Sequence, residues 1–466
     1  MVFSSAIFLL MFLPCVFIGN ILIKDKYSNY FLLLSSLVFY AWGEPCLVLL
    51  MIVSVCINWL IGLLISKTEE KARVLFLVIG IVCNLGMLGY YKYAGFFAEI
   101  VNSVFAREIV PIIEISLPIG ISFFTFQAIS YIVDVYRGDT DASKNLVNVA
   151  LYISFFPQLI AGPIVKYKDI NKQIENRSVS WIDVSDGFKR FIYGLGKKVL
   201  IANTLGKCVD TIYAYDIYAI DCKTAWIGAL AYTFQIYYDF SGYSDMAIGL
   251  GKMFGFRIPE NFNYPYLSNS ISDFWRKWHI SLGSWFREYV YIPLGGNRKG
   301  RFRTYVNLII VFFLTGLWHG ADLSFIVWGL YHCFFSIIER AGFRNILSKN
   351  KTISVIYSFF VVNIGWVLFR ANDTMTGLRY IARMMFPWRH RDLTGIPAWK
   401  YLDSKTVFVF LLAILGMGIM NYLVPKHIKN LWDRSIIEAI YCVIILLLCL
   451  ASIASDTYNP FIYFQF

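Results

Sequence analysis

Apolar runs recur along the whole chain, separated by short polar connectors that are often rich in Lys and Arg. A run of about twenty apolar residues is long enough to cross the ~30 Å hydrocarbon core of a bilayer as a helix. The pattern therefore predicts an all-α polytopic membrane protein with about eleven transmembrane helices. The apolar runs cover residues 2–23, 30–43, 47–65, 74–91, 112–134, 146–165, 223–256, 304–319, 323–338, 352–369, 405–424 and 436–454.

The basic connectors predict the orientation of these helices, because Lys and Arg accumulate in cytoplasmic loops. With Met1 outside, the alternation of runs and connectors leaves the C-terminus outside too. The basic segments 166–177 and 379–405 do not fit this alternation. The stretch 157–163, with two prolines and a glycine, indicates a re-entrant segment, which is tolerated only when it is buried in protein or lines a cavity. The connectors expected in the cytoplasm are residues 24–26, 67–73, 298–303, 339–351 and 426–434.

Composition supports the membrane class. Of the 466 residues, 58% are hydrophobic and 15% are charged, against roughly 45–50% and 25% in soluble domains. A net charge of +12 would favour nucleic acid as the partner of a soluble protein. In a membrane protein it is explained by cytoplasmic loops that meet anionic lipid, so membrane lipid is the expected partner and nucleic acid is not.

The chain shows no linker and no internal repeat, so residues 1–466 are expected to form a single membrane domain. Residues 2–23 have no basic n-region and no small-residue cleavage site, which predicts a retained first helix rather than a signal peptide. The nine cysteines include no Cys-x-x-Cys pair and lie mostly in apolar runs. We therefore expect them to be core residues and expect no metal site.

Two histidines, His319 and His332, lie in the most apolar part of the chain. At ~1.5 Å per residue, a helix from Thr304 places His319 ~22 Å into a ~30 Å core, where an ionisable side chain is costly and indicates function. Asp322 follows three residues later and either orients His319 or caps a helix that starts at Leu323, and the cap is favoured about two to one. His332 fits a buried histidine of a helical bundle as well as a catalytic one.

The segment 269–289 is the second candidate for chemistry. Ser272 and Asp273 predict a helix start, and one face of the helix would then carry Trp275, His279, Leu282 and Phe286. An interfacial amphipathic helix, with its tryptophans at the headgroup level, explains the aromatic residues equally well. It explains the histidine poorly, because an imidazole gains nothing from an apolar face without a partner.

A basic, glycine-rich loop follows at 292–301. Its candidate ligands for the phosphates of a nucleotide-like donor are Arg298, Lys299 and Arg301. A plain turn that carries cytoplasmic positive charge is the favoured alternative.

Three motifs together resemble the signature of the membrane-bound O-acyltransferase (MBOAT) family. They are Phe-Trp-Arg-Lys-Trp-His at 274–279, Trp-His-Gly at 318–320 and Phe-Ile-Val-Trp-Gly-Leu-Tyr-His at 325–332. The start of the chain, residues 39–45 and residues 459–466 are similar to the bacterial alginate O-acetyltransferase branch, so the similarity covers essentially the whole chain. The resemblance implies a ring of helices around a central pore, with a histidine at its waist. It also implies a cytoplasmic acyl donor and a polymer acceptor outside the membrane.

The resemblance assigns the catalytic role to His319, in Trp-His-Gly, and the role of its polar partner to His279. Acyl transfer to a hydroxyl needs a base that works near neutral pH, and histidine, with an ordinary pKa of ~6.5, suits this role. The oxyanion needs a donor, which could be His279, a tryptophan N–H or a backbone N–H. The other candidates for lining the pore or positioning substrate are Trp275, Arg276, Trp278, Ser281, Trp285, Trp318, Asp322, Trp328 and His332.

The resemblance thus implies an O-acyltransferase in the bacterial cytoplasmic membrane, with acetyl-CoA as the donor substrate and no permanently bound cofactor. A sister branch, which transfers D-alanine from a carrier-protein thioester to teichoic acid, supplies the first alternative. A transporter without acyl chemistry is the second, and the missing repeat argues against it. The acceptor polymer stays open between alginate, cellulose, peptidoglycan and another glycan, and the oligomeric state stays open too.

The aromatic C-terminal tail, residues 455–466, is the last candidate. It fits an interfacial anchor at the outer leaflet. It also resembles the Phe-x-Tyr-x-Phe ending of envelope-acylation systems, which implies that Tyr463 accepts the acyl group. An SGNH-hydrolase-like acetyltransferase partner outside the membrane would then pass the group to a polysaccharide.

Overall fold

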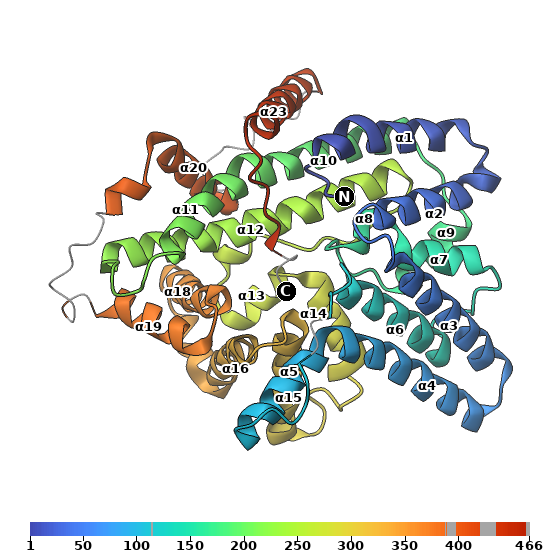
Figure 1. Cartoon of the computed structure of the whole chain (residues 1–466), viewed down its shortest axis with the longest axis horizontal. Coiled ribbons are helices and arrows are strands. Elements are labelled where there is room, and N and C mark those ends of the chain that lie inside the picture. Colours follow the sequence, from blue (N-terminus) through green and yellow to red (C-terminus); the bar gives the residue numbers. More distant parts are fainter. Residues whose placement is uncertain (113–114, 387, 389–397, 420–434, 463–466) are drawn as a thin grey trace. The chain divides into compact units, whose positions relative to one another are not determined.

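The computed structural model describes residues 1–112, 115–386, 388, 398–419 and 435–462. Two compact units make up the chain: the first comprises Met1–Phe191 and Ser244–Pro259, the second Ile192–Tyr243 and Glu260–Phe466. Every regular element in the described residues is a helix, apart from one isolated bridge. The prediction of an all-α protein is therefore confirmed for this part of the chain (Figure 1).

Five helices in the described residues are long and apolar enough to cross a membrane. They are Val48–Lys67, Glu70–Phe105, Gly300–His319, Lys351–Arg370 and Ile436–Ser455, and the shorter apolar helices are Phe8–Leu22 and Ser404–Gly418. The chain is thus a multi-pass membrane protein, while the count of about eleven spans stays a prediction.

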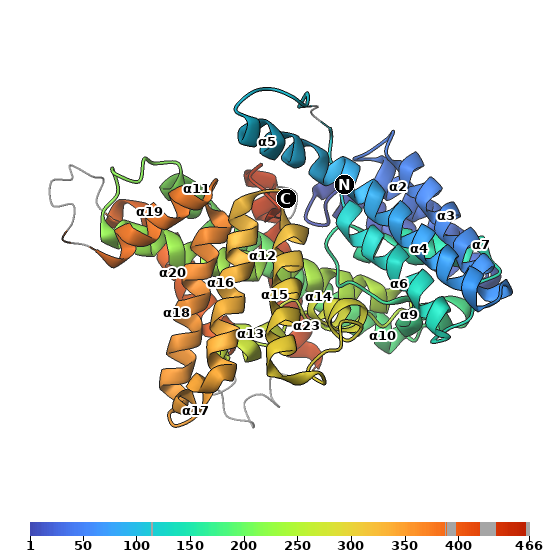
Figure 2. The ribbon, with the colours of Figure 1, turned by 90° about the horizontal axis from the view of Figure 1, so that it is seen from below.

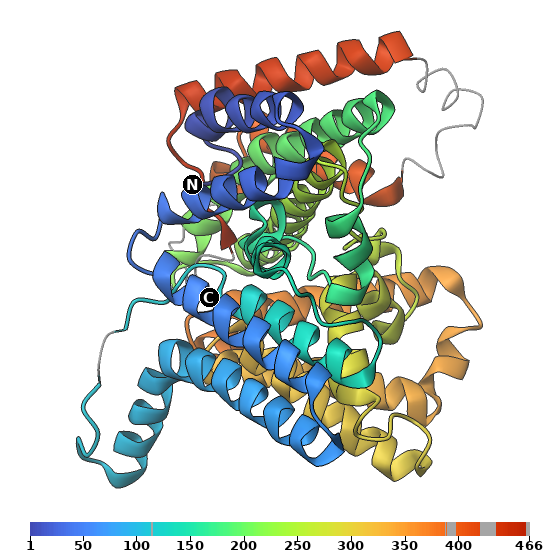
Figure 3. The same cartoon turned by 90° about the vertical axis from the view of Figure 1, so that its right-hand side faces the viewer.

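The first unit is built on helices that pack through small and amide side chains. Helices α3, α4 and α6 lie against one another (Figure 3). Asn58 in α3 and Asn84 in α4 are buried and exchange side-chain hydrogen bonds of 3.1 and 2.7 Å. Such reciprocal amide pairs join helices that have no hydrophobic driving force between them in lipid. The elements of this unit are η1 (Phe8–Phe12), α1 (Leu13–Leu22), α2 (Asp25–Ala41), α3 (Val48–Lys67), α4 (Glu70–Leu88), η2 (Gly89–Tyr93), α5 (Ala94–Phe105), α6 (Ile121–Arg137), α7 (Leu146–Ser154), α8 (Phe156–Leu159) and α9 (Tyr167–Glu175).

Two helix boundaries in the first unit differ from those that the apolar runs alone predict. The apolar run at 112–134 becomes helical only at Ile121, after Gly120 with φ +76°. The run at 146–165 is broken into α7 and α8, and residues 151–165 are buried throughout. The prolines and the glycine of this stretch thus coincide with an irregular, buried segment, and its re-entry into the membrane stays a prediction.

The second unit holds the segments that the sequence singled out. Helices α15, α16 and α18 lie side by side (Figure 2). The elements are η3 (Lys197–Ala202), α11 (Asn203–Tyr213), η4 (Pro265–Leu267), α13 (Ile271–Lys277), α14 (Ile280–Phe286), η5 (Arg287–Tyr291), α15 (Gly300–His319), α16 (Leu323–Ile338), η6 (Glu339–Phe343), α17 (Arg344–Leu347), α18 (Lys351–Arg370), α19 (Thr374–Met385), η8 (Ala398–Tyr401), α20 (Ser404–Ile414), η9 (Leu415–Ile419) and α23 (Ser435–Ser455). Helices α10 (Trp181–Gly196) and α12 (Cys222–Met253) contribute residues to both units.

Helices α15 and α16 approach closely because each carries a glycine where they meet. A Cβ on Gly329 would lie 2.4 Å from the carbonyl oxygen of Phe312, and one on Gly316 would lie 2.4 Å from that of Phe325. Both obstacles are backbone atoms, which cannot rotate away. The glycines therefore set the spacing between α15, which ends at His319, and α16, which carries His332.

Gly329→Ala should lower the stability of the protein in detergent by about 1–3 kcal/mol, because the added methyl group forces two backbones apart. Gly86→Ala is the matched control: Gly86 lies in α4 with no atom within 4 Å of the added Cβ, so the higher helix propensity of alanine should leave the melting temperature unchanged or slightly raised. Thermal unfolding measures both variants. Equal melting temperatures for Gly329→Ala and the wild type would contradict the packing argument.

Candidate active site

His279 lies at a break between two short helices, α13 and α14. Its backbone is left-handed, with φ 47° and ψ 53°, a conformation that is uncommon outside glycine and that clusters at functional sites. The prediction of one continuous helix from Ser272 is therefore wrong. The break is held by a short antiparallel pairing in which Ile280 N donates to Asn261 O and Asn263 N donates to Lys277 O, each at 3.0 Å.

The side chain of Asn261 fixes the tautomer of His279. Asn261 is fully buried, and its Oδ1 accepts from the backbone N–H of Ser281 at 3.2 Å and from the Ser281 hydroxyl at 2.9 Å. The same oxygen lies 3.2 Å from Nδ1 of His279. Since a backbone N–H always donates, this atom is the amide oxygen, and Nδ1 must then carry the proton. The neutral ring consequently presents Nε2 as a proton acceptor.

The N-terminus of α13 is held by two caps. The Ser270 hydroxyl accepts from Asp273 N at 3.0 Å. The buried carboxylate of Glu339, from the turn that follows α16, accepts from Ile271 N at 2.6 Å and Ser272 N at 3.1 Å. A carboxylate at a helix N-terminus satisfies orphan N–H groups and complements the helix dipole. These caps fix the helix that carries Trp275 and leads into His279.

His319 is the last residue of α15 and is 4% exposed. Its ring makes edge contacts with Trp328 and Phe369, at centroid distances of 5.1 and 5.3 Å. Gly320 is required next, because a Cβ there would lie 2.2 Å from the Phe325 ring. Asp322 accepts from Ser324 N at 2.6 Å and so caps α16. The predicted cap by Asp322 is therefore confirmed.

Tryptophans separate the three buried histidines from one another. Trp318 contacts the rings of both His279 and His319, at 5.9 and 5.0 Å. Trp328 contacts both His319 and His332, at 5.1 and 5.2 Å. His332 is fully buried, and among the described residues neither of its ring nitrogens has a hydrogen-bond partner. Trp275 completes the group, with its centroid 5.1 Å from that of His332.

A cavity of about 400 Å³ reaches this group of rings. Its inner end contains buried His279 and Ser336 and partly buried Trp275, and its exposed rim carries three arginines, Arg276, Arg287 and Arg340. The walls between them are mainly apolar, with Val311 and Phe312 among them. The four residues predicted to share a helix face, Trp275, His279, Leu282 and Phe286, all line this cavity although the helix is broken. The cavity therefore joins a cationic rim to a buried imidazole.

Other predicted site residues lie elsewhere. Trp278 is 2% exposed and packs on Phe274 and Trp366 at 5.5 and 4.7 Å, so it belongs to the core of the second unit rather than to a lipid interface. Trp285 is also buried, against Tyr289. The three predicted phosphate ligands, Arg298, Lys299 and Arg301, are exposed and are not among the residues that line the cavity. Tyr463 lies outside the described residues.

Sequence reasoning missed several residues of this site. Asn261 lies in a polar connector with nothing to set it apart, and it pairs with His279 only through the fold. Glu339 and Arg340 both fall in the predicted basic connector 339–351, although Glu339 is buried as a helix cap and Arg340 lies at the cavity rim. Ser336 falls one helical turn after His332, and that spacing could have identified it.

Comparison with known proteins identifies the family of this chain. The model of the membrane-bound O-acyltransferase family matches residues 140–372, which include His279, His319 and His332. The chain is 41% identical, over the full length of both proteins, to a probable alginate O-acetylase AlgI of Pseudomonas putida. It is 35% identical to a peptidoglycan O-acetyltransferase of Helicobacter pylori, over 83% of this chain and 80% of that one.

A more distant relative carries a different acyl group in its name. The chain is 28% identical to a teichoic acid D-alanyltransferase of Bacillus subtilis, over 54% of this chain and 68% of that protein. All three names describe acyl transfer, and the family match spans the cavity and the histidines. The chain is therefore an acyltransferase and belongs to the membrane-bound O-acyltransferase family.

Proposed function

We propose that this protein transfers an acetyl group from cytoplasmic acetyl-CoA, through a central pore in the bacterial inner membrane, to an extracytoplasmic polysaccharide. The observation that carries the proposal is the cavity that runs from exposed arginines to buried His279. A cationic rim suits the phosphates of the coenzyme, and the apolar walls suit the thioester arm. The names of two relatives, one matched over its full length and one over 80% of it, support acetyl as the acyl group.

The reaction needs one base and one oxyanion donor. His319 takes the proton of the attacking hydroxyl as its oxygen bonds to the thioester carbonyl carbon. The tetrahedral intermediate then collapses, the C–S bond breaks, and the leaving thiolate takes the proton back from His319. Neutral His279 presents a proton acceptor through Nε2, so it suits a hydrogen bond from the attacking hydroxyl or the departing thiol rather than the oxyanion.

The oxyanion donor we favour is the indole N–H of Trp275. This residue lines the cavity, and among the described residues its Nε1 is buried without a hydrogen-bond partner. A donor already held in place stabilises developing negative charge without reorganisation.

The acceptor of this first transfer is the phenol of Tyr463, which becomes an aryl ester. Its ordinary pKa of ~10 makes it easier to deprotonate than a sugar hydroxyl, and its ester is activated for a second transfer. An SGNH-hydrolase-like partner outside the membrane then takes the acetyl group onto its own serine and passes it to the polymer. The polymer is alginate or peptidoglycan by similarity to the relatives.

The overall test uses purified protein in lipid vesicles with acetyl-CoA labelled in the acetyl group. Label that appears on the protein, or thiol release that matches it, supports the enzyme reading. Passage of intact acetyl-CoA without any transfer would establish a transporter instead. Competition with a D-alanyl carrier-protein thioester, followed by mass spectrometry of the acylated product, decides between the two acyl groups.

His319→Ala should reduce acetyl transfer by at least ~10²-fold, because a general base contributes ~10²–10⁴-fold. His319→Gln keeps the size and a polar end but cannot take the proton, so it should be equally inactive. Both variants should retain wild-type expression and melting temperature, measured in the same preparation. Retention of more than a tenth of the transfer rate would remove His319 from the role of base.

The cavity rim predicts which basic residues bind the donor. Arg276→Gln with Arg340→Gln should raise KM for acetyl-CoA about tenfold or more, since each charged hydrogen bond is worth ~1.5–3 kcal/mol, and should change kcat less. The matched control is Arg298→Gln with Lys299→Gln, which removes the same charge from an exposed loop that does not line the cavity. If KM rises more in the loop double variant than in the rim double variant, the donor binds at the loop and not at the cavity rim.

Tyr463→Phe should abolish acetylation of the polymer while leaving protein yield and acetyl-CoA binding unchanged. The substitution removes only the hydroxyl and keeps the aromatic ring, so a role as an anchor in the outer leaflet would be unaffected. Mass spectrometry of the C-terminal peptide should detect a single acetyl group in the wild type and none in the variant. Normal polymer acetylation in Tyr463→Phe would eliminate the relay.

A further inference from the structure

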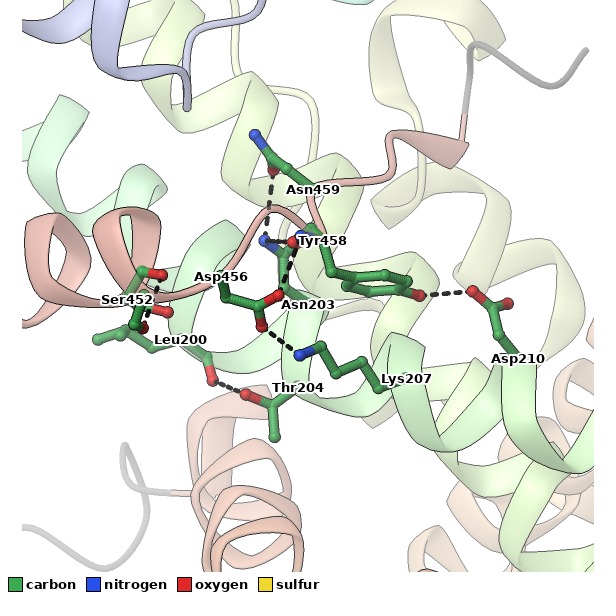
Figure 4. A network of polar contacts seen from close by, with 10 residues as sticks. Leu200, Asn203, Thr204, Lys207, Asp210, Ser452, Asp456, Tyr458 and Asn459 are labelled. Atoms are coloured by element: carbon green, nitrogen blue, oxygen red, sulfur yellow. Dashed lines mark hydrogen bonds and ion pairs between the residues drawn. The ribbon is translucent and has the colours of Figure 1, made fainter.

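After α23 the chain continues as a tail, residues 456–462, that runs into the core of the second unit (Figure 1). Figure 4 shows its first contacts. Asp456 pairs with Lys207 of α11, and Tyr458 donates from its hydroxyl to Asp210 of the same helix at 2.5 Å. Asn203 donates from its amide to the Tyr458 carbonyl oxygen at 3.3 Å. These contacts guide the tail along one face of α11.

A buried ion pair receives the tail next. Lys198 of η3 and Asp239 of α12 form a salt bridge, and each side chain is only 2% exposed. Lys198 Nζ also donates to the carbonyl oxygen of Pro460, and Asp239 Oδ2 accepts from the backbone N–H of Ile462 at 2.9 Å. The pair therefore holds the backbone on both sides of Phe461.

Phe461 fills the space between these two hydrogen bonds. Its side chain is 3% exposed, its ring centroid lies 4.8 Å from that of Tyr243, and Lys198 Nζ lies 5.7 Å from the ring centroid. Ile462 is 5% exposed. The tail is thus buried where it meets the ion pair, after several residues that are partly or fully exposed.

Burial of this pair argues for a role beyond stability. A buried ion pair recovers its desolvation cost only when further hydrogen bonds satisfy its charges, and apolar residues of the same size are often as stable. Here two of those further bonds come from the backbone of the tail. Almost any residue offers a carbonyl and an N–H, so these two bonds alone do not select a register. The Phe461 side chain between them does, because a shift by one residue would turn it away from Tyr243.

We propose that Lys198 and Asp239 form a clamp that fixes the register of the C-terminal tail, so that the residue after Ile462 reaches the acyl group at one defined position. They are positioning residues for the transfer, and this inference rests on the proposed role of Tyr463. The clamp binds a peptide backbone and supplies an ordered starting point one residue before the acceptor. A close tether of this kind raises the effective concentration of the phenol at the thioester.

Two single-glycine insertions test the register. Insertion after Ile462 leaves every clamp contact in place but moves the acceptor by one residue, ~3.3 Å of extended chain. Acetylation of the tail should fall by at least ~10²-fold, because a misplacement of ~1 Å can cost that much. The matched control is insertion after Ser455, before the first tail contact, which the exposed end of α23 can absorb. Its transfer rate should stay within about twofold of the wild type.

Equal activity of the two insertion variants would overturn the clamp while leaving the relay intact, provided that Tyr463→Phe is inactive. An active Tyr463→Phe variant would overturn the relay and the clamp together. Equal loss in both insertions would also overturn the clamp, because the position of the insertion would then not matter. Melting temperatures equal to that of the wild type show that each variant is folded.

A second measurement examines the clamp without any acyl transfer. The full-length protein in detergent is treated with carboxypeptidase, and its intact mass is followed with time. Digestion of the wild type should stop before Phe461 is removed, whereas Lys198→Met with Asp239→Leu should be trimmed toward Ser455. The double substitution avoids an unpaired buried charge, so it should fold. Lys207→Gln is the control and should resist like the wild type, because it removes the contacts of Lys207 with Asp456 and the Tyr458 ring at the start of the tail and leaves the clamp intact. Equal resistance of the double variant would overturn the clamp.

Discussion

A backbone that leaves helical geometry inside a membrane protein must find hydrogen-bond partners within the protein, because lipid offers none. Three buried polar side chains meet this requirement in the second unit. Asn261 supports the break at His279, Glu339 caps the helix before that break, and Asp239 accepts from the tail. Each comes from a segment distant in sequence from the one it holds. The irregular segments, one of which places His279 at the cavity, therefore exist only in the assembled fold.

Aromatic side chains hold the imidazole rings in place, as these polar groups hold the irregular backbone. Trp318 and Trp328 contact the histidine rings on both sides, and large rigid rings have few rotamers to exchange. The close glycine contact of α15 and α16 then fixes the distance between the helices that carry His319 and His332. An imidazole held in this way loses little conformational entropy when it contacts a reacting group. Packing around the histidines therefore contributes to the rate of acyl transfer.

The sequence predicts the helices best where one physical signal dominates. Most long apolar runs became helices within a few residues of their predicted ends, and His319 was identified because an ionisable group in an apolar run is costly. The same argument applies to Asp239, which also lies in an apolar run, 223–256. The helical stretch 181–213 was missed because Lys189, Arg190 and Lys198 interrupt its apolar pattern. The left-handed turn at His279 could not be predicted, since it depends on pairing with Asn261.

The tail shows why side-chain patterns alone miss part of the function. Lys198 and Asp239 bind the carbonyl of Pro460 and the N–H of Ile462, groups that almost every residue provides. At the clamp, Phe461, packed on Tyr243, adds the side-chain requirement that sets the register. The backbone bonds and this one side chain together fix the count of residues between the clamp and position 463. A tail held in this way carries its reactive group at a set distance from the clamp. The buried ion pair therefore specifies this distance more than it specifies the chemistry of the tail.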